Sequence, residues 1–586
     1  MKFLGNVFAT IVGLFVFLML FFFGILIIVA IFGSKPDAVM VKNNSVIELD
    51  LKNIKYDYAG KYKDLWINIF SDKKSVGLTD VINAIEDAKN DGDIKGISIL
   101  NNESSLGMAQ SKALRDKLES FKKSGKFVMA YANSYSQKEY YLNSVASPIY
   151  INPVGGMDFK GLSAEILFFK DLQEKSGVKM EVIRHGKYKS AVEPFLENEM
   201  SDANREQTTA LLNSIWNSVV KEISKSRNVS VDKLNEVANG LLARTPEMAK
   251  EQNLVDIIAY EDVYHNAIRK ALKVDKGDDY NKISIFDYTK KMMTTSKIIE
   301  AKDEIAIIYA QGEIQSGEGD VNTIGEGSMR RSLQEARKNK NVKAIVLRID
   351  SPGGNALTSD LIWREVELTK KVKPVVVSMG NYAASGGYYI ACNANKIFAE
   401  NNTITGSIGV FGILPNFSKL TSKIGVNAEQ VNTHENSAGY SPFVPLGDKF
   451  KAITLEGVEH IYNTFVTHVA EGRKMTFAQV DSIAQGRVWS GSEAIKIGLV
   501  DKIGGLNDAI KEAAALAKVK KYNTRNYPEY EKDFEDLFAN LPFAQSKEAL
   551  IKEELGEENY KVLQDIKRMQ SQKGVQMMMP FEINIQ

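Results

Sequence analysis

The sequence predicts an α/β protein: two tandem copies of one domain, from an internal duplication, behind a single N-terminal transmembrane helix. Three observations support this fold class. Short β-branched runs alternate with helical patterns, which implies strand–helix–strand units and parallel pairing. Blocks of sequence recur in the same order at an offset of about 248 residues. A long uncharged apolar run lies close to the N-terminus.

The apolar run spans residues 7–33 and contains no charged side chain. A bilayer-spanning helix needs about 20 such residues. The run is longer than the apolar region of a signal peptide and has no convincing small-residue cleavage site, so we expect an uncleaved anchor. Flanking lysines orient it only weakly, but the short N-terminal side favours a cytoplasmic N-terminus. We therefore expect a single-pass protein of the inner (plasma) membrane, with its soluble part on the periplasmic or extracytoplasmic side.

The repeat comprises four pairs of similar blocks: 92–100 with 340–349, 126–144 with 373–392, 177–195 with 425–443, and 243–256 with 488–501. A period this long excludes a solenoid, whose repeats run about 20 to 50 residues. Within the second copy, 344–349 and 374–379 read as buried strands and 359–371 as the helix between them. The predicted segments are 1–6 (short N-terminus), 7–33 (anchor), 34–275 (first copy), 276–303 (linker), 304–520 (second copy) and 521–586 (charged tail, expected to be helical and exposed).

Composition excludes several functional classes. The chain has 74 Lys and Arg against 73 Asp and Glu, so its net charge of +1 gives no reason to expect a nucleic-acid partner. Its one cysteine, Cys392, excludes an intramolecular disulfide and a cysteine-rich metal site. The sequence contains no P-loop and no H-E-x-x-H motif. We expect no metal and no cofactor.

Ser385 is a candidate nucleophile in the stretch GNYAASGGYY. It follows the predicted strand 374–379 and precedes a segment that can begin a helix. Its small neighbours allow a substrate backbone to approach, and a helix N-terminus suits a developing oxyanion. The pattern A-x-S-x-G is one residue away from the G-x-S-x-G elbow. On local sequence alone, a buried turn serine is an equally good interpretation.

A serine nucleophile needs a base. None of the five histidines lies in a motif with a spaced acid, although His434 falls in a repeat block near the site. Lys189 is a better candidate because its neighbours are small or apolar. To act near neutral pH its pKa must fall by about 3 from about 10.4, or about 4 kcal/mol, which desolvation can supply. Glu193 would oppose this fall, so we expect it to face away.

A glycine turn, DSPGG, follows the predicted strand 344–349. Ligands in open α/β sheets bind beyond the carboxyl ends of strands. There Gly353 or Gly354 could present a backbone N–H to a bound carbonyl, which a side chain would obstruct. We expect Asp350 to be structural, as a turn former.

The two copies differ at the candidate positions. Gln137 aligns with Ser385, and Ser437 aligns with Lys189. Each copy therefore retains the group that the other lacks. This pattern predicts a single site shared between the two halves.

Together, the segments YKSAVEPF, DSPGG, ASGGYY, TGSIGV and GRVWSG resemble the long bacterial form of the signal peptide peptidase family, serine–lysine peptidases with the Clp/crotonase fold. The resemblance covers both copies and the anchor. It implies Ser385 as nucleophile, Lys189 as general base, and Ser407 as a hydrogen-bond partner of the lysine amine. It also implies an oxyanion hole from Gly386 and Gly354 or Gly353, and a bowl-like homotetramer.

The leading hypothesis is a membrane-anchored serine endopeptidase that degrades cleaved signal peptides and needs no cofactor. Its partners would be peptide substrates, the membrane and further copies of itself. One alternative is an acyl-CoA enzyme on the related crotonase fold, without a serine–lysine pair. Another is a non-catalytic membrane scaffold whose tail is an interaction segment.

Overall fold

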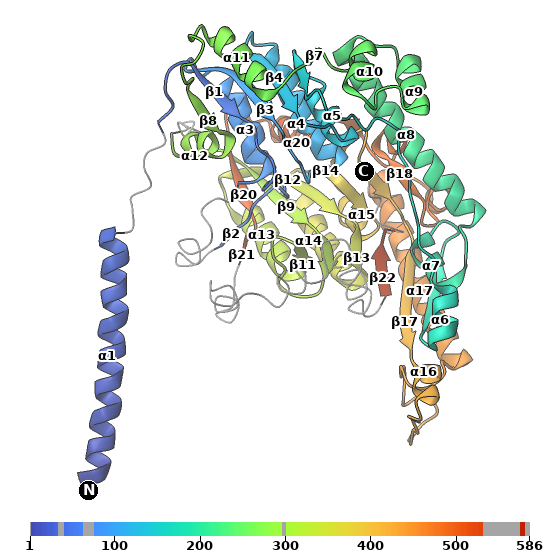
Figure 1. Ribbon diagram of the computed structural model, residues 1–586. Coiled ribbons are helices and arrows are strands. Elements are labelled where there is room, and N and C mark those ends of the chain that lie inside the picture. Colours follow the sequence, from blue (N-terminus) through green and yellow to red (C-terminus); the bar gives the residue numbers. More distant parts are fainter. Residues whose placement is uncertain (1, 33–39, 63–75, 296–300, 531–574, 580–586) are drawn as a thin grey trace.

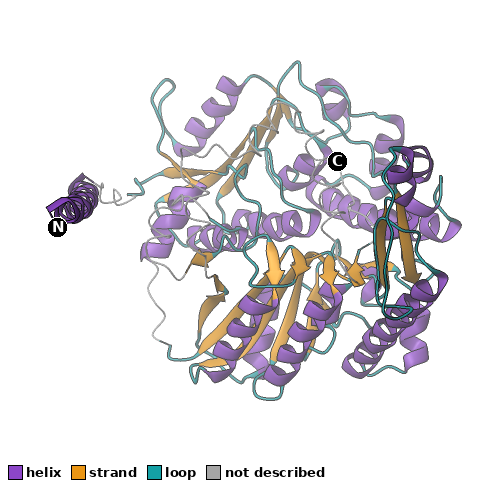
Figure 2. Ribbon diagram, turned by 90° about the horizontal axis from the view of Figure 1, so that it is seen from below, coloured by secondary structure: helices purple, strands orange, loops and turns teal. Residues whose placement is uncertain are grey.

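The computed structural model describes residues 2–32, 40–62, 76–295, 301–530 and 575–579. Helix α1 (Lys2–Phe32) stands apart from the rest of the chain in two views (Figures 1 and 2). Its segment Gly5–Gly24 has a mean hydropathy of 2.6, and no part of that window is buried. By length and composition α1 could cross a membrane. An N-terminal signal sequence would share these properties.

The two copies contain parallel sheets with the same strand order. In the first copy the order is β7 (Ile257–Ile258), β5 (Ile149–Ile151), β4 (Phe127–Ala132), β3 (Ile94–Leu100), β1 (Ser45–Glu48) and β8 (Lys282–Ser284). In the second copy it is β19 (Lys502–Ile503), β15 (Lys396–Ala399), β14 (Val375–Ala384), β12 (Val342–Ser351), β9 (Glu304–Gln311) and β20 (Asn523–Tyr527). At the carboxyl end of β14, its neighbour becomes β16 (Ile404–Gly406), which pairs with β18 (Val488–Ser490). The α/β class and the tandem arrangement agree with the sequence prediction.

Each copy has a last strand beyond the boundary that the sequence suggested. The segment 276–303, expected as a linker, contains β8, which pairs with β1. Its counterpart β20 begins the segment 521–586 and pairs with β9. The remainder of the expected tail helix, 531–574 and 580–586, lies outside the described residues, as do 296–300.

Helices cover both faces of the sheets, so the central strands are continuous apolar runs instead of alternating ones. In β12, Ile345 and Leu347 join one core cluster, and Val346 joins a second cluster on the opposite face. The helices of the first half are α3 (Leu78–Ala88), α4 (Met108–Lys122), α5 (Gln137–Asn143), α6 (Lys170–Ser176), α7 (Glu193–Leu196), α8 (Asp202–Arg227), α9 (Val231–Gly240), α10 (Pro246–Glu251), α11 (Glu261–Leu272) and α12 (Ile285–Thr295). Those of the second half are α13 (Glu326–Lys338), α14 (Ala356–Lys370), α15 (Gly386–Ala391), α16 (Ser418–Lys423), α17 (Asp448–Arg473), α18 (Phe477–Ile483), α19 (Gly491–Ala494) and α20 (Leu506–Leu516).

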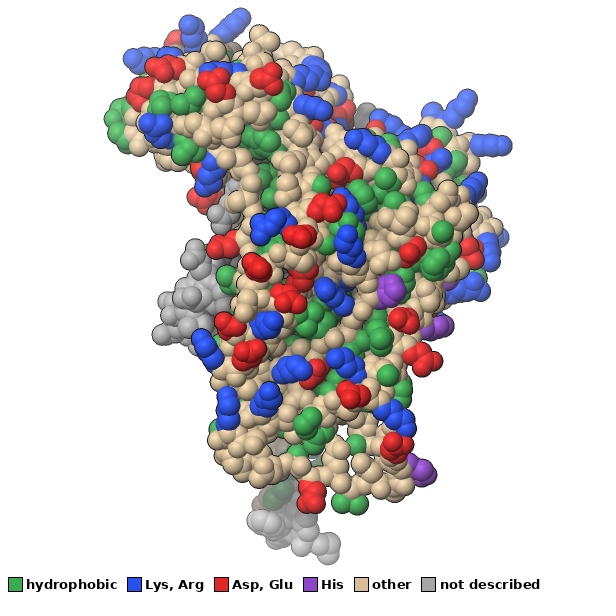
Figure 3. Space-filling model, turned by 90° about the vertical axis from the view of Figure 1, so that its right-hand side faces the viewer, with side chains coloured by type: hydrophobic (Ala, Val, Ile, Leu, Met, Phe, Trp, Pro, Cys, Tyr) green, Lys and Arg blue, Asp and Glu red, His purple; other side chains and the backbone are tan. Residues whose placement is uncertain are grey.

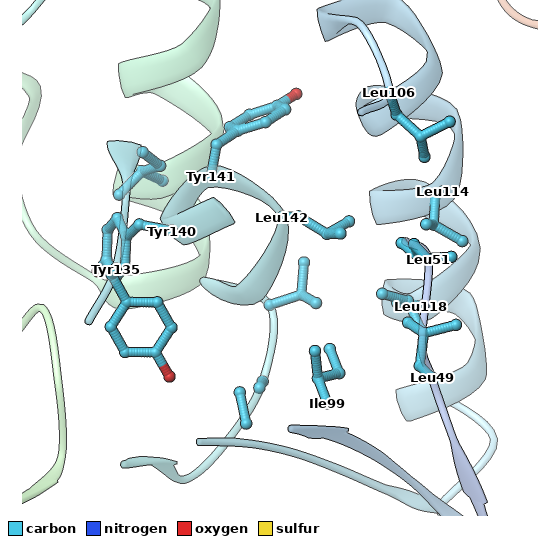
Figure 4. Packing of buried hydrophobic residues seen from close by; sticks show 14 of the residues in the cluster. Leu49, Leu51, Ile99, Leu106, Leu114, Leu118, Tyr135, Tyr140, Tyr141 and Leu142 are labelled. Atoms are coloured by element: carbon cyan, nitrogen blue, oxygen red, sulfur yellow. The ribbon is translucent and has the colours of Figure 1, made fainter. Parts of the chain in front are cut away.

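The core of the first copy continues into the second. Leu114 and Leu118 of α4 face Leu142, and the same cluster contains Ile99 of β3 and Leu49, the residue after β1 (Figure 4). Three residues of the second copy also belong to this cluster: Ala384, Ile404 and Val488. The core cluster of the first copy therefore extends across the boundary between the halves and reaches Ala384, the residue that precedes Ser385.

A third sheet combines strands from both copies. Its order is β11 (Thr323–Gly325), β10 (Glu313–Gln315), β13 (Gly353–Asn355), β22 (Val575–Met578), β17 (Val410–Asn416) and β6 (Lys179–His185). Strand β6 of the first copy pairs antiparallel with β17 of the second, from Val410 opposite His185 to Asn416 opposite Lys179. A short pair, β2 (Lys61–Tyr62) with β21 (Glu529–Tyr530), also links distant segments. The β6–β17 pairing carries the chain to Lys189 beside the second copy.

Charged side chains of both signs are interspersed over the face shown in Figure 3. Lysines and arginines alternate there with aspartates and glutamates instead of forming one broad basic area. The described residues of this face therefore offer no single-sign patch of the kind that steers a polyanion.

Candidate active site

Ser385 lies on a sharp turn between β14 and α15. Its backbone has φ 54° and ψ −115°, a conformation that residues other than glycine seldom adopt. The Ser385 N–H donates to the Gly406 carbonyl at 2.8 Å, and the Ser385 carbonyl accepts from the Tyr389 N–H at 2.8 Å. These bonds hold the strained turn, and the serine side chain is fully buried. Strain of this kind concentrates at functional sites.

Lys189 reaches this serine from the first copy. It follows β6 and is fully buried. Its Nζ lies 2.9 Å from the Ser385 Oγ, 3.0 Å from the Ser407 Oγ and 3.1 Å from the Ser407 carbonyl oxygen. The structure thus brings together three residues that the sequence singled out.

The surroundings of Lys189 disfavour its charged form. Burial lowers the pKa of Lys189 well below the usual value for a lysine. Among the described residues no carboxylate forms an ion pair with it, and its oxygen neighbours are hydroxyls and a carbonyl. The Glu193 carboxylate instead accepts hydrogen bonds from Ser201 and Asn204, so it is turned away as expected. These surroundings favour the neutral amine.

Two glycines that the sequence analysis missed make room for the lysine. A Cβ on Gly486 would lie 2.7 Å from the Lys189 backbone, and Gly486 has φ 82°. A Cβ on Gly409 would lie 3.1 Å from the Lys189 Cδ. Gly409 lies in the motif TGSIGV, and Gly486 is the first residue of the motif GRVWSG. Ser407 itself has φ 50° and its N–H donates to the Arg487 carbonyl at 2.7 Å.

The predicted oxyanion glycines meet beside the serine. Gly386 is the first residue of α15, and a Cβ on Gly353 would lie 2.9 Å from its nitrogen. Gly353 and Gly354 form β13 with φ 105° and 150°, a region that favours glycine. A Cβ on Gly354 would overlap the Ile314 carbonyl oxygen of β10. The glycines thus permit backbone approaches that any side chain would block.

Asp350 of β12 ties this strand to β14, the strand that precedes Ser385. Its carboxylate accepts from the Tyr382 N–H at 2.9 Å and from the Asn381 Nδ2 at 3.1 Å. Asn381 in turn accepts from two N–H groups at the start of α4, those of Ala109 and Gln110. Burial, with a smaller contribution from Asp57, raises the pKa of Asp350 to about 7. The sequence predicts a turn-forming Asp350, but Asp350 lies within β12, and its hydrogen bonds join two strands and, through Asn381, the other copy.

The histidines lie away from this cluster. The His434 side chain is exposed, and its backbone N–H donates to the Ser437 Oγ at 2.9 Å. His185 stacks on Tyr462, and His468 pairs with Asp360. In the described part of the chain none of the five histidines forms a hydrogen bond with Ser385.

Comparison with known proteins assigns the family. The profile of Peptidase family S49 matches residues 120–275 and 367–520, one segment in each copy. The chain belongs to peptidase family S49. Protease 4 of Haemophilus influenzae is 38% identical over 460 residues, which cover 76% of this chain and 74% of that protein. Protease 4 of Salmonella typhi is 37% identical over 460 residues, which cover 77% of this chain and 74% of that one.

A shorter relative matches one part of this S49 peptidase. The putative signal peptide peptidase SppA of Enterococcus faecium is 37% identical over 202 residues, covering 34% of this chain and 58% of that protein. The family resemblance inferred from the motifs is thus confirmed, and the chain is a serine peptidase that hydrolyses peptide bonds.

Proposed function

We propose that this S49 peptidase cleaves peptides with Ser385 as nucleophile and Lys189 as general base, and that its substrates are cleaved signal peptides at the membrane. The observation that carries the proposal is the 2.9 Å separation of the Lys189 Nζ and the Ser385 Oγ. This contact is buried and lacks a carboxylate that would hold the lysine in its charged form. An acyl-CoA enzyme or a scaffold would not need such a pair.

The hydrogen-bond pattern around the amine supports a proton transfer from Ser385 to Lys189. A neutral amine has two N–H groups and one lone pair. The Ser407 carbonyl can only accept, and the Ser407 hydroxyl can accept the second N–H. In the neutral amine the lone pair is then left to face the Ser385 hydroxyl, whose Oγ lies 2.9 Å from the Nζ. Ser407 thus orients the base toward the nucleophile.

The reaction follows from this arrangement. Ser385 attacks the substrate carbonyl as Lys189 takes its proton, and the N–H groups of Gly386 and of Gly354 or Gly353 stabilise the oxyanion. Charged Lys189 then protonates the leaving amine, which releases the carboxyl-side product. Neutral again, it activates the water that hydrolyses the acyl-enzyme.

Two further observations support the proposed substrate class and location. The name of the Enterococcus faecium relative specifies signal peptides, and we apply that substrate to this chain. Helix α1 is long and apolar enough to anchor the protein in the membrane where such peptides remain. We propose that the catalytic part lies on the extracytoplasmic side of the inner membrane.

A homotetramer is supported by two unpaired segments. At the repeat offset of about 248 residues, the segment of the first copy that corresponds to β17 is 162–168. The segment of the second copy that corresponds to β6 is 427–433. Neither segment is a strand in the structure. Val431 is 99% exposed, whereas its repeat mate Ile183 is 4% exposed. Pairing 427–433 of one copy with 162–168 of the next would reproduce the β6–β17 contact, and head-to-tail contacts of this kind close into rings.

The test of this proposal uses the full chain in detergent. We expect a synthetic signal peptide to be cleaved and a fluorophosphonate to label the protein on Ser385. The Ser385→Ala variant should lose both properties. Cleavage at the wild-type rate by that variant, or no cleavage of any peptide by the wild type, would overturn the assignment.

A further inference from the structure

A cavity of about 220 Å³ lies between the two copies, apart from the serine–lysine site. Helices α3 and α4 of the first copy line one side of it, and the beginning of α20 of the second copy lines the other. The buried ion pair of Arg348 with Asp57 also lines it. A water molecule takes up about 30 Å³, so the cavity has room for a small organic molecule.

One carboxylate in this cavity has no partner. Glu400 follows β15, lines the cavity and is 5% exposed. Within the part of the chain that the structure describes, its side chain forms no hydrogen bond and no ion pair. A Cβ on Gly505 would lie 2.8 Å from the Glu400 Oε1, which places the carboxylate at the beginning of α20. Such a group is rare, because nothing compensates for the water it has lost.

The nearest cations are already paired with other carboxylates. Lys112 pairs with Asp116, and Arg348 pairs with Asp57. Burial raises the pKa of Glu400 to about 7, and the attraction of Lys112 and Arg348 only partly opposes this rise. Protonation would not satisfy the group, because a carboxylic acid has an O–H that itself needs an acceptor. In either form, Glu400 presents an unsatisfied polar group to the cavity.

The other charged side chains of the cavity leave this group unpaired. Lys117 donates to Glu86 at 2.6 Å, and the Asp508 carboxylate accepts from the Gly505 N–H at 3.1 Å. Lys511 is exposed. The charge that still needs a partner in the interior of the cavity is therefore the negative charge of Glu400.

The remaining walls restrict what can bind beside Glu400. Leu78 and Ile82 of α3, Ala113 of α4 and Leu506 of α20 are apolar, so ordered water would find few partners along them. A divalent cation needs about six oxygen ligands. Among the described residues no group of three or more His, Cys, Asp or Glu side chains is placed to hold a metal ion. One cationic group on an apolar body fits both the carboxylate and the walls.

We propose that this cavity binds a small ligand that carries a primary ammonium group on an apolar body, with the ammonium against the Glu400 carboxylate. An ammonium is a compact charge with three donors, so a single carboxylate satisfies it better than the five donors of a guanidinium group. The ligand contacts both copies, so its binding stabilises their docked arrangement. A free amine and the amino terminus of a peptide both supply this chemistry.

The experiment measures binding to the full chain in detergent by ligand-observed NMR. The probes are 3-methylbutylammonium, a free amine, and L-leucinamide, which represents the amino terminus of a peptide. The uncharged control, 3-methylbutanol, has the same apolar body as the amine. For 3-methylbutylammonium we expect a Kd of about 1 mM, in keeping with its small size, and binding of the alcohol should be at least about tenfold weaker.

Three variants locate the site. Glu400→Gln keeps the shape of the side chain without its charge and should weaken ammonium binding by about tenfold or more. Ala113→Phe fills the cavity from the first copy, keeps Glu400 and should also prevent binding. Glu103→Gln changes a carboxylate that is 76% exposed and does not line the cavity, so it should bind as the wild type does. A cooperative thermal transition shows that each variant is folded, and the ammonium should raise the Tm of the wild type but not that of Glu400→Gln.

Three results would overturn the inference. One is the absence of binding of either ammonium probe to the wild type, which would leave the cavity to water. A second is equal binding by the wild type and Glu400→Gln. A third is binding that Glu400→Gln loses and Ala113→Phe keeps, which would place the ammonium outside the cavity. Tighter binding of L-leucinamide supports the site with a peptide amino terminus as its ligand, and tighter binding of 3-methylbutylammonium supports it with a free amine. Neither outcome depends on the proposed function, because Ser385 and Lys189 do not line the cavity.

Discussion

The Lys189 Nζ and the Ser385 Oγ lie 2.9 Å apart, although 196 positions separate the two residues in the chain. The lysine belongs to the first copy and the serine to the second. Their distance is set by the pairing of β6 with β17 and by the apolar interior that both copies share. Under the proposed mechanism, activity depends on how the two copies dock.

Replacing the base should abolish turnover without unfolding the protein. We expect Lys189→Met to lower kcat/KM by at least about a thousandfold, because serine is a weak nucleophile without a base. Lys187→Met is the matched control, since Lys187 is exposed two residues away. It should keep activity close to wild type. Equal losses in both variants would point to disruption of the segment and not to loss of a base.

The pH dependence should report the lowered pKa of Lys189. Only the neutral amine accepts a proton, so kcat/KM should rise as pH increases through that pKa. The unfolded chain binds this proton up to about pH 10.4, whereas the folded protein has released it. Stability should therefore rise with pH in this window, by about 1.4 kcal/mol per pH unit relative to Lys189→Met. Urea unfolding at several pH values measures this difference. If the free energy of unfolding changes with pH equally in wild type and Lys189→Met, Lys189 is not neutral in the folded protein.

Ser407 should act through the lysine. Ser407→Ala removes one acceptor of the Lys189 amine, a loss of about 1 kcal/mol that corresponds to roughly a fivefold fall in kcat. Because the hydroxyl orients the amine, the pH profile should also shift. Ser407→Thr, which retains a hydroxyl, should recover part of the rate. An unchanged pH profile in Ser407→Ala would show that the Ser407 hydroxyl does not orient the Lys189 amine.

The buried ion pair between the copies should matter for stability. The Arg348 Nε lies 2.6 Å from the Asp57 Oδ2, and both residues are 3% exposed. Asp57→Asn would leave the Arg348 guanidinium buried without its countercharge, at a cost of about 3–5 kcal/mol. The exposed pair of Lys343 with Asp303 is the control, and Asp303→Asn should change stability by less than about 1 kcal/mol. Denaturant unfolding of both variants measures the difference.

Assembly should depend on the segment 427–433. Val431→Asp places a charge in the proposed inter-copy strand pairing, where Val431 is 99% exposed in the single chain. We expect the detergent-solubilised tetramer to dissociate, as measured by analytical ultracentrifugation. Val372→Asp is the control, because Val372 is also exposed but lies in the turn after α14. A tetramer that persists in Val431→Asp would disprove this interface.

The sequence located most of the site because duplication left a comparison inside one chain. The loss of serine at Gln137 and of lysine at Ser437 pointed to one divided site, and the structure brings Lys189 to Ser385. Strand β22 was not predictable. It is short, it follows a strongly charged stretch, and its partners lie more than 150 residues away, so no local pattern marks it. The role of Gly486 was also not predictable from the sequence. A side chain is excluded at this position only because Lys189 packs against it in the folded protein.

The division of the site between the copies has a consequence during synthesis. A ribosome makes the anchor and the lysine-bearing half first. Under the proposed mechanism, a chain halted before residue 385 would hold the base but no nucleophile, so prematurely terminated products could not cleave peptides. The peptidase would become active only after the second copy has been made and its strand β17 has paired with β6 of the first.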